Sequence, residues 1–269
     1  MEVGIGFIGT PIGDTQDITR KALDLLNKGK TLVCEDTRKS KDILERLGVN
    51  YSDKRFISFH EHSGEQKLKD LVMMARQDLV LYLSDAGSPL ISDPAYPLVL
   101  ECLKEDVPFC FASGITAPVY ALENSGLPPI PFSFHGFFPR EAGKIKEYMS
   151  TLANGTHLFF EGVSRVEKTL KIFSEVVPDA DVVVARELTK SFETFHRFKA
   201  RDYEKEEITY KGEFVLLVHI SGQVMTGNKI TELAEGVLNS GGKPKDVAKL
   251  IAEILGRKSK DIYQELSRN

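Results

Sequence analysis

Residues 79–94 read LVLYLSDAGSPLISDP, an apolar run of strand length that changes abruptly into small, polar and turn-forming residues. The apolar run, residues 79–83, suits a strand that is buried on both faces. The segment after it has little side-chain bulk, so a ligand can approach its backbone N–H groups closely. Because ligands of open α/β sheets bind beyond the carboxyl ends of the strands, this segment is either an ordinary turn or one edge of a binding site.

Strand and helix patterns alternate through the first half of the chain. Helical spacing is clear at Ile18, Ala22, Leu25 and Leu26, behind a predicted N-cap at Asp17. Such alternation implies crossover connections, and therefore a mostly parallel sheet covered by helices. The predicted strands of this α/β domain, residues 1–114, are residues 3–8, 31–34, 55–59, 79–83 and 108–111.

The proline-rich segment SGLPPIPFSFHGFFP, residues 125–139, changes the character of the sequence, and we place a domain boundary just before it. A second α/β domain, residues 115–222, has more hairpin character toward its end. Residues 223–269 form a predicted helical tail that resembles a helix-turn-helix, with a helix stop at Gly256. The predicted strands of the second domain are residues 132–137, 157–160, 181–186, 192–198 and 213–220.

The composition restricts the class of protein. With 269 residues, of which 42% are hydrophobic, the chain can bury a sizeable core. Cys34, Cys102 and Cys110 have no CxxC spacing, so we expect a reducing compartment, no disulfide framework and no metal. No signal-peptide pattern or transmembrane run is evident, so we expect a cytoplasmic protein without a membrane partner. Because the formal net charge is −4, nucleic-acid binding would need a local basic patch.

Residues 4–9, GIGFIG, match the GxGxxG pattern of dinucleotide-binding proteins. That pattern must follow a strand and open a helix, whereas here it lies inside a predicted strand and Pro11 follows at once. We therefore expect Gly4 and Gly6 to lie where a neighbouring backbone approaches the strand. The sequence has no P-loop, no GxSxG elbow and no HExxH motif, so nucleotide hydrolysis, serine hydrolysis and zinc proteolysis have no visible apparatus.

Four segments of small or polar residues end strands of the first predicted sheet. They are GTPIG at residues 9–13, CEDTR at 34–38, SDAGSP at 84–89 and ASGITA at 112–117. Because the carboxyl ends of parallel strands meet at one edge of a sheet, the four segments predict a single binding cleft. In the second half, the strip of residues 186–201 has five basic and two acidic residues, which indicates either a phosphate-bearing partner or a solvated hairpin.

Six motifs carry a resemblance to a known family: GTPIGDTQDIT, CEDTRKS, YLSDAGSPLISDP, FHGFFPR, VVVARELTKSFETFH and KGEFVLLV. Their order and spacing resemble the tetrapyrrole methylase-like family, and within it the bacterial 16S ribosomal RNA cytidine 2′-O-methyltransferases. The resemblance covers nearly the whole chain. It implies an α/β fold of two domains, with a mostly parallel N-terminal sheet and a mixed C-terminal sheet, and a small helical tail. It also implies S-adenosyl-L-methionine as cofactor, 16S rRNA or the 30S subunit as partner, a homodimer and no metal.

The resemblance also implies roles for particular residues. A sugar hydroxyl is a poor nucleophile, so Lys190 is expected to stabilise the developing alkoxide, with Glu187 orienting it and Asp36 or Arg38 acting from the opposite wall. Substrate contacts are expected from Arg186, Glu193 and Arg165. The expected cofactor-binding residues are Pro11, Asp85, Ala86, Gly87, Ser88, Ile91, Ser113, Thr116, Ala117 and Phe137.

Two loops depart from the family pattern: SGITA stands at residues 113–117 where PGPSA is usual, and FEGVSR at 160–165 where FYESPHR is usual. Two other functions remain open. One is a C-methyltransferase of the same fold that acts on a corrinoid or siroheme precursor. The other is a non-enzymatic RNA-binding protein, which would leave the four converging segments without a purpose.

Overall fold

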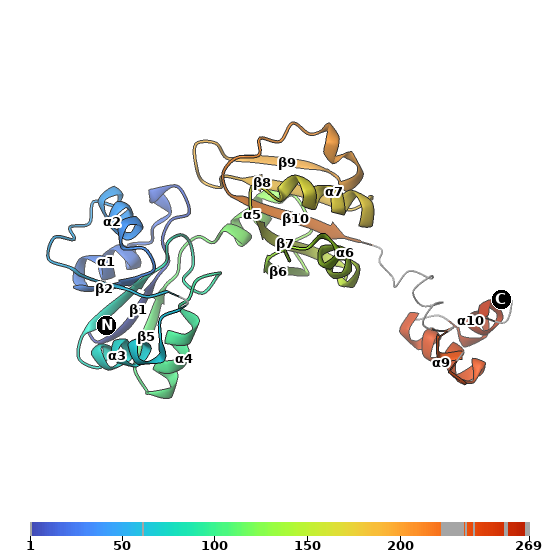
Figure 1. Ribbon diagram of the computed structural model, residues 1–269, viewed down its shortest axis with the longest axis horizontal. Coiled ribbons are helices and arrows are strands. Elements are labelled where there is room, and N and C mark those ends of the chain that lie inside the picture. Colours follow the sequence, from blue (N-terminus) through green and yellow to red (C-terminus); the bar gives the residue numbers. More distant parts are fainter. Residues whose placement is uncertain are drawn as a thin grey trace. The chain divides into compact units, whose positions relative to one another are not determined.

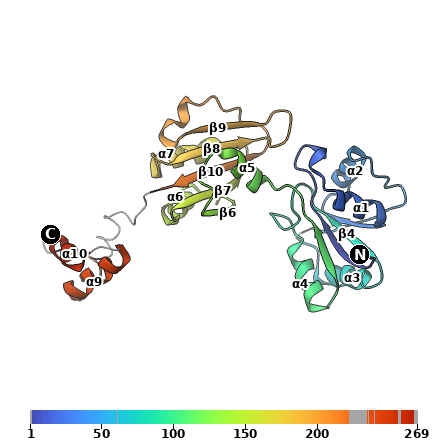
Figure 2. The ribbon, with the colours of Figure 1, turned by 180° about the vertical axis from the view of Figure 1, so that it is seen from behind.

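The computed structural model describes residues 2–60, 62–221, 234, 236–238, 240–255 and 258–266. The chain divides into two compact units, Met1–His219 and Ile220–Asn269. The first unit contains two five-stranded sheets with their helices (Figures 1 and 2), which confirms the predicted α/β class. The predicted boundary between residues 114 and 115 falls inside this unit, between the two sheets, and it stays a prediction, as does the start of the tail at residue 223.

The first sheet is entirely parallel, with strand order β3-β2-β4-β1-β5. In this order β2, β4, β1 and β5 are consecutive neighbours, so the carboxyl ends of these four strands lie side by side at one edge of the sheet. The strands are β1 (Gly4–Ile8), β2 (Thr31–Cys34), β3 (Arg55–Ser58), β4 (Leu79–Leu83) and β5 (Phe109–Ala112). One α-helix follows each of the first four strands in chain order: α1 (Arg20–Lys28), α2 (Thr37–Arg46), α3 (Glu65–Ala75) and α4 (Tyr96–Lys104).

Strand β4 is buried on both faces, as its apolar run predicts. Val80 and Tyr82 pack in the cluster formed with α3 and α4. Leu81 and Leu83 point the other way, into the cluster formed with α1 and α2. Alternate residues of one strand therefore anchor helices on both faces of the sheet, which fixes the strand's carboxyl end between two packed layers.

Two local predictions are wrong. The N-cap of α1 is Thr19, whose hydroxyl accepts a hydrogen bond from the Ala22 N–H at 3.2 Å, while Asp17 ends the short 3-10 helix η1 (Thr15–Asp17). The reason is that the helix begins at Arg20, too late for Asp17 to reach its first N–H groups. Gly4 meets the backbone of Pro108, as predicted, but a Cβ on Gly6 would meet the side chain of Leu81 at 2.8 Å rather than a backbone.

The second sheet is mixed, with strand order β6-β7-β10-β8-β9. Strands β6 and β7 are parallel, whereas β8 is antiparallel to both β9 and β10. The strand predicted at residues 192–198 begins in the structure at Thr194, two residues later than predicted. The reason is that the N–H of Glu193 donates to the Lys190 carbonyl inside the hairpin loop. The strands are β6 (Phe132–Phe137), β7 (Gly155–Glu161), β8 (Asp181–Arg186), β9 (Thr194–Lys199) and β10 (Phe214–Ile220).

Helices cover both faces of this sheet too. Helix α5 (Ala117–Ser125) packs on Leu158, Val215 and Leu217. On the other face, Phe138 stacks on Phe159 at 3.7 Å between ring centroids, next to α6 (Ala142–Thr151) and α7 (Val166–Val176). A six-residue 3-10 helix, η2 (Ala200–Lys205), follows β9.

In the second unit, helices α9 (Pro244–Leu255) and α10 (Ser259–Leu266) pack through a small apolar cluster. The cluster joins Ala248, Ile251 and Ala252 to Ile262 and to Ala234. Gly256, the predicted helix stop, lies outside the described residues. Across the described ranges, no helix has both the length and the apolar character that crossing a bilayer requires.

Candidate active site

The loops that follow β1 and β4 are joined to each other. Thr10 and Gly87 form an antiparallel bridge, with N–H to O distances of 3.0 and 2.9 Å. The buried Ser84 hydroxyl donates to the Gly87 carbonyl at 2.6 Å and lies 3.1 Å from the Thr10 hydroxyl. Gly87 has φ +76, a conformation that side chains with a Cβ rarely adopt. The two loops thus form one hydrogen-bonded edge.

The loops after β5 and β2 meet the same edge. The N–H of Gly9 donates to the Ala112 carbonyl at 3.0 Å, and a Cβ on Gly9 would lie 3.0 Å from the Gly114 nitrogen. On the other side, the Asp85 carboxylate accepts from the Asp36 N–H at 3.4 Å and pairs with Lys39 at 2.8 Å. The four segments that the sequence predicts to converge do lie together.

A cavity of about 550 Å³ opens beside this edge and is lined by residues of both sheets' loops. Its volume lies in the usual range for small-molecule sites. Eight of the ten predicted cofactor-binding residues line it, whereas Pro11 lines a second cavity and Ser113 is in neither lining. The eight are Asp85, Ala86, Gly87, Ser88, Ile91, Thr116, Ala117 and Phe137.

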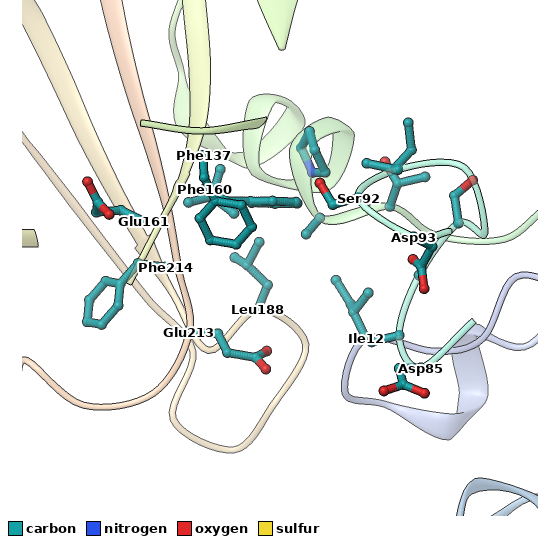
Figure 3. A pocket seen from close by; sticks show the side chains of 18 of the residues that line it. Ile12, Asp85, Ser92, Asp93, Phe137, Phe160, Glu161, Leu188, Glu213 and Phe214 are labelled. Carbon is teal, nitrogen blue, oxygen red and sulfur yellow. The ribbon is translucent and has the colours of Figure 1, made fainter. Parts of the chain in front are cut away.

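One wall of this cavity has an aromatic surface, and Asp85 and Asp93 lie on the opposite wall. Phe137 and Phe160 lie beside each other, with ring centroids 5.4 Å apart, and Figure 3 shows them across the cavity from Asp85 and Asp93. Phe137 is 58% exposed, which leaves its ring free to pack on a ligand. An aromatic surface facing hydrogen-bonding groups suits a flat heterocycle with polar substituents.

The lining contains five acidic residues and one basic residue, so we name it the acidic cavity. Three of the carboxylates have cationic partners: Lys39 pairs with Asp85, Arg165 with Glu161 and Lys190 with Glu213. Glu35 and Asp93 have no ion-pair partner among the described residues. Burial, followed by repulsion from Asp85 and Glu35, raises the pKa of Asp93 to about 7.

A second cavity, of about 760 Å³, adjoins the first and shares Ile12, Lys39, Asp85 and Ala86 with it. It lies between the loop after β1, one face of α2 and the β8–β9 hairpin. Its lining has four basic residues, Arg38, Lys39, Arg46 and Lys190, against three acidic ones, Asp14, Asp42 and Asp85. We name it the basic cavity.

The β8–β9 hairpin places Lys190 in the lining of the basic cavity, where its ammonium reaches Glu213 in the lining of the acidic cavity, so Lys190 marks the boundary between the two. The ammonium donates to Glu187 at 3.0 Å and to Glu213 at 2.8 Å. Burial lowers the pKa of Lys190, but the hydrogen bonds to Glu213 and Glu187 outweigh it, and the pKa is raised overall. For Glu187, burial acts to raise the pKa, but the hydrogen bonds from the Glu213 N–H and from Lys190 outweigh it, and the pKa is lowered. Lys190 is therefore a positioned cation and not a proton acceptor.

The two residues predicted on the opposite wall behave differently from each other. Asp36 is the N-cap of α2, and its carboxylate accepts from the Arg38 N–H at 2.8 Å. That backbone bond, with the Arg38 side chain, lowers the pKa of Asp36 and makes it a poor proton acceptor at neutral pH. The Arg38 side chain is 91% exposed and lines the basic cavity.

The three predicted substrate-binding residues hold loops in place and appear in neither described cavity lining. Arg186 donates to the carbonyls of Lys211 at 2.6 Å and Phe192 at 3.0 Å. Glu193 accepts from the Thr189 N–H at 2.6 Å. Arg165 pairs with the fully buried Glu161 carboxylate at 2.6 Å, so the unusual FEGVSR loop keeps this ion pair. A substrate role for these residues stays a prediction.

Several lining residues were not singled out from the sequence. Asp93 and the segment from Gly212 to Val215 belong to the quoted motifs, but only the fold reveals that they face the same space. Arg46 carries no signal of its own, because only its place two turns after Arg38 on α2 brings it to the basic cavity. Within the described ranges, no set of three or more histidine, cysteine or carboxylate side chains is arranged to hold a metal ion.

Comparison with known proteins identifies the class. The chain belongs to the tetrapyrrole (corrin/porphyrin) methylase family, whose model matches residues 4–204. Two curated relatives are both named ribosomal RNA small subunit methyltransferase I. The one from a Hydrogenobaculum species is 36% identical over 78% of this chain and 93% of its own. The one from Streptococcus pyogenes serotype M3 is 33% identical over 96% of this chain and 92% of its own.

The fold is also that of solved family members. A uroporphyrin-III C-methyltransferase from Thermus thermophilus, in complex with S-adenyl homocysteine, matches with a TM-score of 0.55 and 16% identity. The match covers 80% of this chain and 97% of that one. At this identity the likeness supports the fold alone, and it agrees with the predicted two-sheet architecture.

Proposed function

We propose that this protein is a methyltransferase that moves a methyl group from S-adenosyl-L-methionine to the ribose 2′-hydroxyl of a cytidine in 16S rRNA. The observation that carries the proposal is the match to relatives named ribosomal RNA small subunit methyltransferase I, which spans up to 96% of the chain. That match continues beyond residue 204, where the family model ends. It therefore includes sequence outside the part shared with tetrapyrrole methylases.

The acidic cavity fits the cofactor. A Cβ on Gly87 would lie 3.3 Å from Ile12, and one on Gly9 would lie 3.0 Å from the Gly114 nitrogen, so the glycines let the loops after β1, β4 and β5 pack closely at the edge of this cavity. The unpaired carboxylates of Glu35 and Asp93 favour a ligand with a positive charge. Cofactor binding by the residues predicted from the sequence rests on this fit.

When bound, the sulfonium cofactor supplies a methyl group that needs only an aligned nucleophile. The chain's contribution is then orientation of the ribose hydroxyl and stabilisation of its developing negative charge. Lys190 can stabilise that negative charge with its own positive charge from the boundary of the two cavities. Glu187 and Glu213 hold its ammonium in place. Because the pKa values of Asp36 and Glu187 are lowered, neither is suited to remove the proton.

We also propose that the protein is a homodimer that works on 16S rRNA or the 30S subunit in the cytoplasm. Helix α4 supports the dimer, because Tyr96, Leu100 and Leu103 lie at helical spacing and are 59%, 47% and 63% exposed. A second copy of the chain would cover this apolar stripe. Sedimentation tests this: we expect the intact protein to be a dimer and a Leu100→Glu variant to be a monomer. A wild-type protein that sediments as a monomer would contradict the proposal.

Methyl transfer from tritiated S-adenosylmethionine tests the main proposal against its rivals. We expect label in rRNA from 30S subunits of cells that lack the enzyme, and none in a corrinoid or siroheme precursor. Label in the tetrapyrrole instead would support the C-methyltransferase reading. Calorimetry that detects no binding of S-adenosylmethionine would support a non-enzymatic RNA-binding protein.

A further inference from the structure

The basic cavity adjoins the acidic cavity, and its walls come from three separate segments. Pro11 to Thr15 form one wall, α2 forms the second, and Thr189 to Ser191 of the hairpin form the third. The hydroxyl of Thr189 accepts a hydrogen bond from the Asp14 N–H at 3.1 Å, which links the first wall to the third. The cavity is therefore built by packed and hydrogen-bonded elements.

Charge separates the two adjoining cavities. Five carboxylates and one lysine line the acidic cavity, whereas four cations and three carboxylates line the basic cavity. The difference in lining charge favours an anion such as RNA in the basic cavity over the acidic cavity, and a cationic cofactor in the acidic cavity over the basic one. The shared residues Lys39 and Asp85 form an ion pair at 2.8 Å where the two linings meet.

Two of the cations remain available to a ligand. Lys39 and Lys190 are held close to carboxylates, but the Arg38 side chain is 91% exposed, and its pairing with Asp36 at 3.4 Å involves a carboxylate already used as a helix cap. Arg46 is 49% exposed, lies 4.0 Å from Asp42 and donates one N–H to the Gly13 carbonyl at 2.8 Å, which leaves other N–H groups of its guanidinium for a ligand. Exposed pairs of this kind contribute about 0–1 kcal/mol, so a phosphate can replace them.

Arg38 and Arg46 lie on the same face of α2, eight residues apart, which places them about 12 Å apart along the helix axis. Guanidinium groups bind phosphate in a bidentate manner. The concave shape matters as well, because a ribose inside a regular RNA helix lies on a wide, shallow groove and does not project into a hollow. A nucleotide reaches such a cavity by leaving its stack.

We propose that the basic cavity receives one unstacked nucleotide of the RNA substrate, with Arg38 and Arg46 binding the phosphates on its flanks. This inference rests on the proposed function and specifies its substrate as single-stranded or locally opened RNA. The base lies against the apolar side chains of Pro11, Ile12 and Ile43 in the same lining. The ribose hydroxyl then faces Lys190 at the boundary with the acidic cavity.

The test compares the wild type with the double variant Arg38→Gln and Arg46→Gln, and with Lys41→Gln as a matched control. Lys41 is also on α2, but its ammonium lies over the Phe56 ring at 5.2 Å and it lines neither cavity. Binding of 30S subunits is measured over a range of salt from about 50 to 200 mM, and calorimetry with S-adenosylhomocysteine checks the acidic cavity.

We expect the slope of log affinity against log salt to fall by about 1.4 in the double variant, or about 0.7 for each phosphate that is no longer neutralised. KM for the RNA should rise while kcat and S-adenosylhomocysteine affinity stay constant, and Lys41→Gln should match the wild type. An unchanged slope and KM in the double variant, with wild-type methylation intact, would overturn the cavity assignment alone. Wild-type protein that transfers no methyl group to rRNA would overturn the proposed function and this inference with it.

Discussion

Lys190 is a cation whose two carboxylate partners hold it in a defined position. Replacing it with methionine keeps much of the side chain's volume and removes the charge. If it stabilises the developing alkoxide, single-turnover methyl transfer at saturating RNA should slow by about 10²- to 10³-fold, while cofactor affinity stays constant. Lys190→Arg should restore a large part of the rate because it restores the charge.

The matched control is Lys199→Met, a lysine of β9 that pairs with Asp181 at 2.8 Å and lines neither cavity. It should react at the wild-type rate. If saturating RNA returns Lys190→Met to the wild-type rate, Lys190 is a binding residue and the account of its chemistry is wrong.

Asp93 gives the acidic cavity a dependence on pH. Its pKa is raised to about 7 by burial and by Asp85 and Glu35, with Lys39 opposing them. Its folded-state pKa lies above the unfolded value of 3.8, so the protein loses stability as the pH rises from about 4 to about 7, and above pH 7 the folded protein bears the full cost of a buried, ionised Asp93. The positive sulfonium of S-adenosylmethionine offsets the cost of the ionised Asp93, whereas the neutral thioether of S-adenosylhomocysteine does not.

We therefore expect the ratio of S-adenosylmethionine to S-adenosylhomocysteine affinity to increase from about pH 6 to pH 8 in the wild type. Asp93→Asn should make this ratio independent of pH, because asparagine has no carboxyl proton that the bound sulfonium could displace. Calorimetry at both pH values measures it. A wild-type ratio that is independent of pH would show that Asp93 does not sense the sulfonium charge.

At the scale of the elements, the edge formed by the loops after β1 and β4 depends on Gly87. A side chain there must adopt φ +76, which costs about 1–2 kcal/mol, and its Cβ would press on Ile12. Gly87→Val should abolish binding of S-adenosylmethionine while the protein remains folded. Gly48→Val is the matched control, because Gly48 has φ +68 but no atom within 4 Å of its Cβ position.

Both variants should lose similar stability in urea unfolding, and only Gly87→Val should lose the cofactor. Equal cofactor affinity in a folded Gly87→Val protein would mean that the cofactor does not approach this edge. Loss of binding in both variants would trace the defect to general destabilisation instead.

The elements also show how far the sequence predicts the structure. The strands of the first sheet were predictable to within a residue because all but β3 are apolar runs that end at small or polar residues, and parallel order then brings four loops together. The hairpin geometry was not predictable. Glu187 and Thr189 have φ values of +51 and +59; the Glu187 carboxylate accepts from the distant Glu213 N–H, and the Thr189 N–H donates to Glu193 within the loop.

The candidate site was predictable in part for the same reason. Eight of the residues predicted to bind the cofactor line the acidic cavity, because they lie at or just after strand ends. By contrast, Arg186 and Arg165 look like ligand-binding cations in sequence and are held by carbonyls or a buried carboxylate in the fold. Whether a charged side chain is free depends on neighbours far away along the chain. One sequence without its fold does not contain that information in a local pattern.

At the scale of the whole molecule, we expect the tail to act in substrate binding and not in the chemistry. Residues 229–269 have eight basic and six acidic side chains. Truncation after Gly222 should weaken 30S binding and leave S-adenosylmethionine affinity unchanged, as measured by sedimentation and calorimetry. Undiminished methylation by the truncated protein would show that the tail does not bind the substrate.

The central claim is that this chain methylates the ribose of a cytidine in 16S rRNA. Its most direct test is nucleoside mass spectrometry of 16S rRNA from 30S subunits that were incubated with the purified protein and S-adenosylmethionine. The subunits come from cells that lack the enzyme, so any new modification is due to the added protein. The account predicts a gain of 2′-O-methylcytidine that Lys190→Met largely abolishes. A methyl group on a base, or no gain with active protein that binds its cofactor, would contradict it.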